Sequence, residues 1–271
     1  MTQSEFINVK RLIRSKNAKL AKWIPNFVIK YLERIIHQQE INDFLARTHT
    51  ENQAFCKDIL DFIGITYSID GLENIPKEGK CIIVVNHPLG GMDAIALVDA
   101  LKNHRTDIQF IVNDLLLNLE PLKGIFVGVN KHGKTKNNSL LKVNELFASD
   151  KLVCVFPAGL VSRKMKGVVK DLEWKKTFVK QAKQNNQPIV PIHIEGNLTN
   201  FFYRLANFRK FIGIKANIEM LYLVDEMFKQ KGKHVHFTVG KPIDPSSLDT
   251  SKSDAKWAEW LRTHVYNLKK K

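Results

Sequence analysis

The sequence predicts an α/β protein, with a largely parallel β-sheet flanked by helices and an N-terminal amphipathic helical element. Two observations lead to this fold class. After Thr66, short runs rich in Val and Ile recur, and helix-like stretches separate several of them. Alternation of strands with helices is typical of parallel sheets, because a crossover helix returns the chain to the starting edge. The first forty residues instead repeat apolar residues at helical spacing.

The N-terminal segment is basic as well as amphipathic. Apolar residues recur with a helical period from Phe27 to Ile36, and Pro25 is expected to begin that helix. A basic helix with aromatic side chains is typical of a membrane-surface element, but also of a surface helix that docks on its own core. Both interpretations stay open. We assign residues 1–62 to N-terminal basic amphipathic helices and residues 63–271 to the α/β domain.

Five apolar, β-branched runs predict the strands of this domain. They are Cys81–Val85, Ile108–Val112, Leu152–Phe156, Pro188–Ile194 and His234–Val239. Helical periodicity predicts helices between or after them. These are Asp93–Leu101, Ser139–Phe147, Glu173–Gln184 and a closing helix at Trp257–Leu268.

Composition narrows the class of protein. The net charge is +15, from 42 Lys and Arg against 27 Asp and Glu, which implies an acidic partner: nucleic acid, an anionic membrane surface or an acidic carrier protein. Cys56, Cys81 and Cys154 are too scattered for a disulfide framework or a zinc site, so a reducing compartment is expected. We expect no secretion signal, and no apolar run approaches the ~18 residues of a spanning helix.

The most informative segment is Val84–Asp93, with the sequence Val-Val-Asn-His-Pro-Leu-Gly-Gly-Met-Asp. An apolar strand leads into His87, crosses a Pro/Gly turn and enters a helix near Asp93, which places both side chains at the carboxyl end of the sheet, where ligands bind. A His paired with a carboxylate is a natural general base. The structural alternative treats Asp93 as a helix N-cap and His87 as a loop residue.

A second strand also ends in a Pro/Gly turn. Val155–Arg163 has the sequence Val-Phe-Pro-Ala-Gly-Leu-Val-Ser-Arg, and Lys164 and Lys166 follow it. Backbone N–H groups in such a turn, together with Arg163, favour an anionic group. The alternative is an ordinary basic loop.

Taken in order, these segments resemble the lysophospholipid/glycerol-phosphate acyltransferase family. The resemblance spans residues 65–245 and includes Gly124-Ile-Phe-Val127 and Gly240-Lys-Pro-Ile-Asp244. It is strongest to the branch of haemolysin-like or amino-acid-lipid O-acyltransferases. It implies that His87 is the general base and that Asp93 orients it.

The resemblance also implies substrate-binding residues. The Phe-Pro-x-Gly segment carries acceptor binding onto Phe156, Pro157, Gly159 and Arg163. We add Asn86, Gly90, Gly91 and Ser162 to this set, because they belong to the same two turns. The glycines let the first loop fold back, and backbone N–H groups near Gly90 or Gly159 are candidate oxyanion donors.

Two departures from the family pattern stand out. Five residues separate His87 from Asp93 where the family has four, and Ala158 stands where the family has Glu. The paired glycines can absorb the extra residue. The loss of the acidic side chain disfavours glycerol 3-phosphate-type acceptors and favours a lyso-amino-acid lipid over lysophosphatidic acid.

A competing motif predicts a different function. Gly128–Thr135 matches the phosphate-binding P-loop pattern, and Leu221–Glu226 resembles its acidic magnesium-site partner. A P-loop NTPase is therefore the alternative. It leaves both Pro/Gly turns without a role, and the following helix is expected only near Ser139.

The expected function is transfer of a fatty acyl group from an acyl thioester to the hydroxyl of a lyso-lipid. The expected partners are acyl carrier protein or acyl-CoA as donor, a lyso-lipid acceptor and an anionic membrane surface. We expect no metal, no cofactor beyond the acyl donor and no nucleic acid. The expected location is cytoplasmic, peripheral on the inner membrane face.

Overall fold

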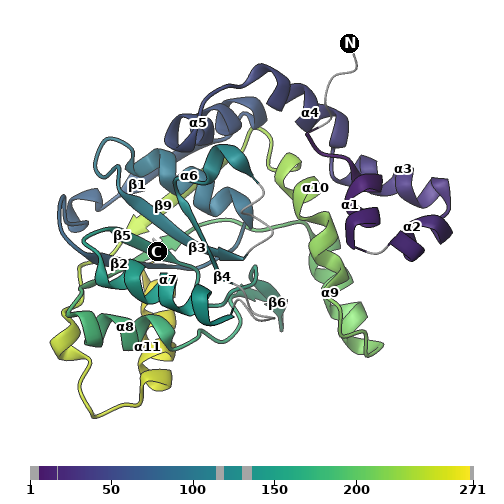
Figure 1. Ribbon diagram of the computed structural model, residues 1–271. Coiled ribbons are helices and arrows are strands. Elements are labelled where there is room, and N and C mark those ends of the chain that lie inside the picture. The colour runs from purple at the N-terminus through teal and green to yellow at the C-terminus, as the bar shows by residue number, and fades with distance from the viewer. Residues whose placement is uncertain (1–5, 17, 114–118, 130–135, 269–271) are drawn as a thin grey trace. The chain divides into compact units, whose positions relative to one another are not determined.

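The computed structural model describes residues 6–16, 18–113, 119–129 and 136–268 (Figure 1). The chain divides into two compact units. One consists of Met1–His49 with Leu198–Lys231, and the other of Thr50–Asn197 with Gly232–Lys271. Both units are therefore discontinuous in sequence, and the first takes in a segment that the sequence had assigned to the α/β domain. The domain boundary expected after residue 62 stays a prediction.

The described part of the second unit contains a seven-stranded sheet of order β1-β9-β8-β2-β5-β3-β4. Only β8 and β9 pair antiparallel, and the other neighbours run parallel, which confirms the predicted fold class. The strands are β1 Thr66–Asp70, β2 Cys81–Val85, β3 Ile108–Asn113, β4 Phe126–Val129, β5 Leu152–Val155, β8 Ile189–Ile194 and β9 His234–Val239. A separate antiparallel hairpin joins β6 Arg163–Met165 to β7 Val168–Lys170.

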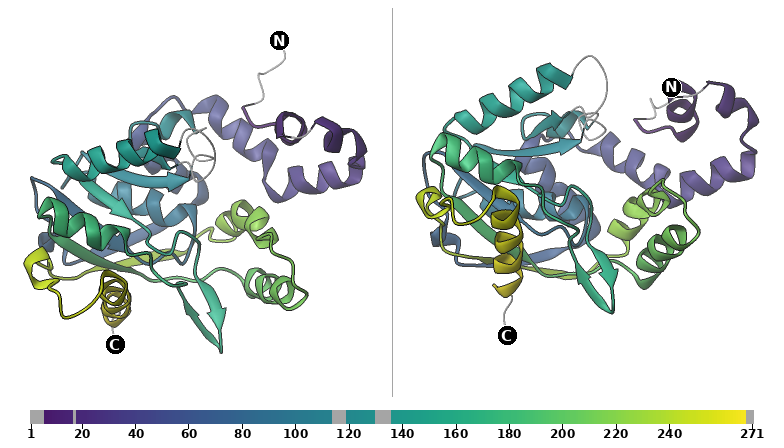
Figure 2. Two further views of the ribbon diagram at one scale, coloured as in Figure 1. Left: turned by 60° about the horizontal axis from the view of Figure 1, so that its bottom comes forward. Right: turned by 90° about the horizontal axis from the view of Figure 1, so that it is seen from below.

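Helices cover both faces of this sheet (Figures 1 and 2). On one face lie α5 Asn52–Ile63 and α6 Gly91–Leu101. On the other lie α7 Lys136–Ala148, α8 Thr177–Asn185 and α11 Asp254–Asn267. Ile82 and Val84 of β2 join the core beneath the second group of helices, and every residue of β2 is buried. This explains why the central strand is an unbroken apolar run in the sequence. Short 3₁₀ turns occur at η1 Leu72–Asn74, η3 Glu120–Leu122 and η5 Pro245–Ser247.

Most of the predicted elements are confirmed. Cys81–Val85 and His234–Val239 have the predicted bounds, and α6, α7 and α11 begin two or three residues earlier than expected. The sequence missed β1, β4 and the β6–β7 hairpin. Length is not the reason, because β5 has only four residues and was predicted. The missed strands instead contain polar or charged residues, or in β4 a glycine, so they lack an unbroken apolar run.

The first unit is helical. It contains α1 Val9–Lys16, α2 Ala18–Trp23, α3 Asn26–Ile35, α4 Gln38–Arg47, α9 Asn200–Phe211, η4 Ile218–Tyr222 and α10 Leu223–Phe228. Pro25 stands directly before α3, as predicted. The Tyr31 and Tyr222 hydroxyls are 2.6 Å apart, and the His37 ring stacks on Phe228 at 3.9 Å. These contacts join the N-terminal helices of this unit to its second segment, Leu198–Lys231. In the part of the chain that is described, no helix is both long enough and apolar enough to cross a bilayer.

Candidate active site

Asn86 fixes the end of the central strand β2. Its side-chain amide donates to the Ile194 carbonyl at 2.8 Å, and its carbonyl oxygen accepts from the Ile194 N–H at 2.7 Å. Ile194 is the last residue of β8, which runs parallel to β2. This buried side chain therefore holds the backbone from which His87 projects, next to the carboxyl end of the neighbouring strand.

The turn after Asn86 brings His87 and Asp93 together. Gly90 has φ +73° and ψ −135°, which side chains with a Cβ rarely adopt, and α6 begins at the next residue. Asp93 lies in the first turn of α6. Its Oδ2 is 2.8 Å from His87 Nδ1 and accepts the Leu89 N–H at 2.9 Å. The N-cap of α6 is Gly90, so Asp93 is not the N-cap that the structural alternative expected. Its carboxylate instead holds the preceding turn through Leu89 and contacts the imidazole.

The electrostatics of this pair follow from burial. Asp93 is fully buried, its Oδ1 has no hydrogen-bond partner, and burial raises the pKa of the carboxyl despite the opposing His87 hydrogen bond. A carboxylate accepts, so Nδ1 carries the proton and Nε2 is the basic nitrogen. The His87 side chain keeps 17% exposure, and no described residue hydrogen-bonds Nε2. This arrangement can accept a proton from a substrate.

The second Pro/Gly turn lies against the imidazole. Phe156 follows β5, the parallel neighbour of β2, and its ring stacks on His87 with centroids 4.1 Å apart and a 21° interplanar angle. Phe110 also stacks on Phe156, with ring centroids 5.7 Å apart. Gly159 has φ +65°, donates its N–H to the Phe156 carbonyl, and a Cβ there would come within 3.1 Å of Lys175 Nζ. The structure therefore brings the two predicted turns together.

Ser162 and Arg163 reach the site through the backbone. The Ser162 N–H donates to the His87 carbonyl at 2.8 Å, while the Ser162 hydroxyl donates to Asp171 at 2.5 Å. The hydroxyl is therefore directed at a carboxylate and not at the imidazole. Arg163 is only 6% exposed, and its guanidinium donates to the Val161 carbonyl.

Asp171 is the site residue that the sequence missed. Its fully buried carboxylate accepts from the His87 N–H at 3.1 Å, from the Ser162 hydroxyl and from Trp174 Nε1 at 2.8 Å. Its N–H donates to the Tyr266 hydroxyl, and its carbonyl accepts from Arg262. Burial and the Asp171 charge raise the pKa of Tyr266. The signal in the sequence is faint: an acid three residues before a Trp.

The remaining expectations concern metals and nucleotides. No cluster of His, Cys, Asp and Glu among the described residues can hold a metal ion. Residues 130–135 of the P-loop motif lie outside the described residues. Its expected acidic partner makes local contacts in the helical unit: Asp225 binds His37 and Lys229, and Glu226 accepts from Thr199.

Comparison with known proteins identifies the family. A family model described as acyltransferase matches residues 11–271. The lyso-glycine lipid O-acyltransferase of Phocaeicola vulgatus is 43% identical over 97% of this chain and 95% of its own length. The Bacteroides thetaiotaomicron protein of the same name is 44% identical over 97% of both chains.

A solved structure shares the fold. The 1-acyl-sn-glycerophosphate acyltransferase of Thermotoga maritima matches with a TM-score of 0.53 and 21% identity, over 81% of this chain and 78% of that one. The fold, the two joined turns and the full-length relatives agree, and they favour the acyltransferase interpretation over the nucleotide-binding one. The chain belongs to the acyltransferase family.

Proposed function

We propose that this enzyme transfers a fatty acyl group from an acyl thioester to the hydroxyl of a lyso-lipid, with a lyso-glycine lipid or a similar lyso-amino-acid lipid as acceptor. The observation that carries the chemistry is the 2.8 Å contact between His87 Nδ1 and the buried Asp93 carboxylate. The two relatives are named lyso-glycine lipid O-acyltransferases and match nearly the whole chain, and their names therefore support this acceptor class.

In the proposed mechanism, His87 Nε2 takes the proton of the acceptor hydroxyl while its oxygen attacks the thioester carbonyl. Asp93 holds the imidazole and stabilises its positive charge. The tetrahedral intermediate collapses, the C–S bond breaks, and the imidazolium returns the proton to the thiolate. No acyl-enzyme is needed, in keeping with a Ser162 hydroxyl that donates to Asp171.

The oxyanion of that intermediate needs backbone donors. The N–H groups of Gly159 and Leu89 are already donated to Phe156 and Asp93. We therefore assign the oxyanion to the first-turn amides of α6, at Gly91 and Met92, which have no intrahelical acceptor. A Cβ built on Gly91 meets nothing within 4 Å, so there is room for substrate beside this turn.

The second Pro/Gly turn, within Val155–Arg163, indicates which acceptor head group the site would bind. Ala158 is buried and offers neither charge nor hydrogen bond, which suits a less polar acceptor than glycerol phosphate. The carboxylate of a glycine head group would pair with Lys164 in the β6–β7 hairpin, because the Arg163 guanidinium is buried and already donates to the Val161 carbonyl.

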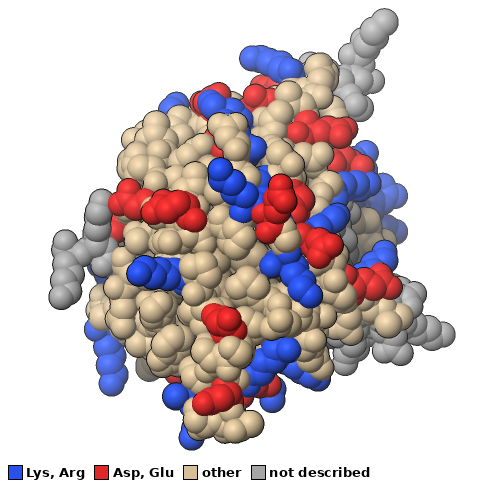
Figure 3. Space-filling model, turned by 90° about the vertical axis from the view of Figure 1, so that its left-hand side faces the viewer, with Lys and Arg blue, Asp and Glu red and all other residues tan. Residues whose placement is uncertain are grey.

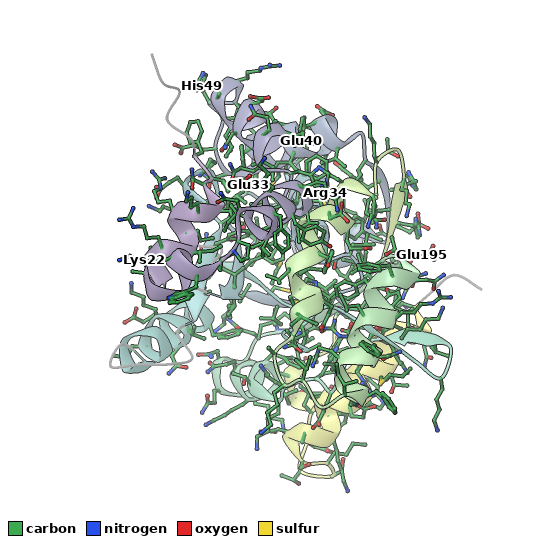
Figure 4. The ribbon with its side chains drawn as sticks, turned by 90° about the vertical axis from the view of Figure 1, so that its right-hand side faces the viewer. Lys22, Glu33, Arg34, Glu40, His49 and Glu195 are labelled. Atoms are coloured by element: carbon green, nitrogen blue, oxygen red, sulfur yellow. The ribbon has the colours of Figure 1, made fainter. Side chains whose placement is uncertain are left out.

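We further propose that the protein is peripheral on the inner face of a membrane, bound through its N-terminal helices. Trp23 is 85% exposed and Phe27 is also largely exposed. Lys22, which is labelled in Figure 4, precedes Trp23 in the last turn of α2. The net charge of +15 favours acyl carrier protein, which is acidic, as donor.

The test compares the kinetics of the purified enzyme with two acceptors, lyso-glycine lipid and lysophosphatidic acid. Each acceptor is assayed with two acyl donors, acyl-CoA and acylated acyl carrier protein. We expect the higher kcat/KM for the lyso-glycine lipid. His87→Ala should lower kcat by about 10²–10⁴ with an unchanged circular dichroism spectrum. A fully active His87→Ala enzyme rejects the mechanism, and a higher kcat/KM for lysophosphatidic acid rejects the acceptor.

Lys134→Ala separates this function from the alternative one. The acyltransferase proposal expects unchanged acyl transfer, because the Lys lies in the P-loop motif and in neither Pro/Gly turn. Joint loss of nucleotide binding and activity would favour the NTPase.

A further inference from the structure

The end of helix α9 exposes apolar side chains that the catalytic proposal does not use. Phe211 is 88% exposed and Phe208 is 59% exposed, and Ile212 and Ile214 are also open to solvent. Single exposed apolar residues are common on protein surfaces, but four within seven residues form a patch. We call these four residues the α9 patch.

The backbone that carries the α9 patch is tightly built. Gly213, with φ +78°, reverses the chain after α9. The Ile214 N–H donates to the Arg209 carbonyl at 2.9 Å, and the Gly213 N–H donates to the Lys210 carbonyl at 3.2 Å. These two bonds form a Schellman motif, which fixes the conformation of a helix end. The apolar side chains are therefore held outward by an ordered turn.

The polar side chain of this turn points the other way. Arg209 donates to the fully buried carboxylate of Glu219, to the Ile214 carbonyl at 3.1 Å and to the Asn217 side chain. The Glu219 contact raises the pKa of the guanidinium. A turn that directs Arg inward and Phe and Ile outward inverts the usual arrangement in water. Such a surface suits an apolar environment.

Charge identifies the partner. Residues 200–217 contain no Asp or Glu, and Arg204, Lys210 and Lys215 are exposed within them. The face of the molecule in Figure 3, by contrast, mixes acidic and basic side chains. Apolar side chains among cations match the interface of an anionic bilayer, where Phe and Ile enter the acyl boundary and Lys contacts phosphate. Two copies of the same cationic surface would repel each other.

We propose that the α9 patch is a membrane-binding element, which inserts Phe208, Phe211, Ile212 and Ile214 into an anionic lipid surface. It lies in the same compact unit as the N-terminal helices but in a segment some 170 positions further along, for which the sequence predicted no membrane contact. The inference rests on the proposed function only in that a lyso-lipid acceptor resides in a membrane. Vesicle binding is measured without turnover, so the two proposals fail separately.

The first test is flotation of the full-length protein with phosphatidylcholine vesicles that contain or lack phosphatidylglycerol. Phe211→Ser should lower the partition coefficient about tenfold, the value of one buried Phe side chain. The double variant Lys210→Glu, Lys215→Glu should lose binding only to the anionic vesicles. The matched controls are Leu141→Ser and Lys180→Glu, exposed positions on α7 and α8 that should leave binding unchanged.

The second test locates the patch in the bilayer. The three native cysteines are buried, so Ile214→Cys introduces an accessible thiol for an environment-sensitive fluorophore. A blue shift on addition of anionic vesicles, absent from Leu141→Cys, supports the proposal. Unchanged flotation of Phe211→Ser together with no shift at position 214 overturns it. So does a Phe211→Ser variant that binds vesicles normally but loses self-association in analytical ultracentrifugation, since the partner is then a second copy.

Discussion

Two buried carboxylates flank His87, and the regions around them differ in how far their oxygens are satisfied. Asp93, six residues after His87, contacts the imidazole and leaves Oδ1 without a partner. Asp171, 84 residues away in sequence, contacts the His87 backbone, and both of its oxygens accept hydrogen bonds. In the proposed mechanism Asp93 is therefore the carboxylate whose interaction changes during the reaction, and Asp171 is the one that holds the loop in place.

Physical chemistry explains the division. Burial makes the charge of Asp93 costly, and this raises the pKa of its carboxyl. Perturbed pKa values are common among reacting groups. A fully hydrogen-bonded carboxylate such as Asp171 gives rigidity instead, because removing one partner leaves buried donors unpaired. The same residue type therefore serves two purposes within one loop cluster.

Among the substitutions considered, Asp93→Asn should have the largest effect on activity. We expect kcat to fall by about 10²–10⁴, because the imidazolium loses its anionic partner. The free energy of unfolding should change by less than about 1 kcal/mol, since a neutral amide replaces a costly buried charge. Stopped assays and urea unfolding check both parts. A large loss of stability with activity retained would reverse the roles.

Asp171→Asn should give the opposite pattern. Its amide cannot accept from His87 N–H, Ser162 and Trp174 together, so the free energy of unfolding should fall by about 2–4 kcal/mol. Enzyme that remains folded at low temperature should keep kcat within about tenfold of the wild type. Differential scanning calorimetry beside steady-state kinetics measures the two quantities. A stable but inactive variant would place Asp171 with the reacting groups.

Asp107 is a third carboxylate, and its pKa is lowered where that of Asp93 is raised. The hydrogen bond from the buried Arg105 lowers the pKa of Asp107, so its contribution to stability is present above the unfolded-state pKa and lost as pH falls through the folded-state pKa. Because the Asp107 side chain is 36% exposed, solvent screens the pair, and Asp107→Asn should cost only about 0.5–1 kcal/mol at neutral pH. The difference in the free energy of unfolding should persist down to the unfolded-state pKa near about 4 and disappear only at lower pH, below the lowered folded-state pKa. Urea unfolding at neutral pH and in stronger acid tests this, and a constant difference would contradict it.

Ser162→Ala should have the smallest effect. The variant loses one hydrogen bond to Asp171, worth about 1 kcal/mol, but keeps the backbone bond to the His87 carbonyl. We expect kcat to fall less than about tenfold, whereas loss of a covalent nucleophile costs far more. A burst of released thiol in the wild type that disappears in this variant would point to an acyl-enzyme.

The parts of this site that the sequence predicted are local. His87 and Asp93 share one strand–turn–helix segment, so their residue types and spacing carry the prediction. Phe156 could be placed at the same sheet edge because it ends another apolar strand. Asp171 could not, because its contacts depend on a loop that follows a three-residue hairpin strand without apolar alternation. Substrate binding by Asn86 stays a prediction, and its hydrogen bonds to the Ile194 backbone depend on a strand 108 positions away that local sequence cannot place. The α9 patch could not be predicted, because sequence periodicity does not show which apolar side chains remain exposed to solvent.

The pairing of Asn86 with Ile194 spans 108 positions, and it bears on how this enzyme is made. During synthesis on the ribosome, β8 emerges long after β2 and its other neighbour β5, so the nascent chain at first carries Asn86 without its Ile194 partner. Contacts between distant segments form late, since loop closure must precede them. We therefore expect the turn from His87 to Asp93 to reach its final geometry only after residue 194 has left the exit tunnel. A chain that ends before β8 would carry the whole turn without the two hydrogen bonds that hold its start.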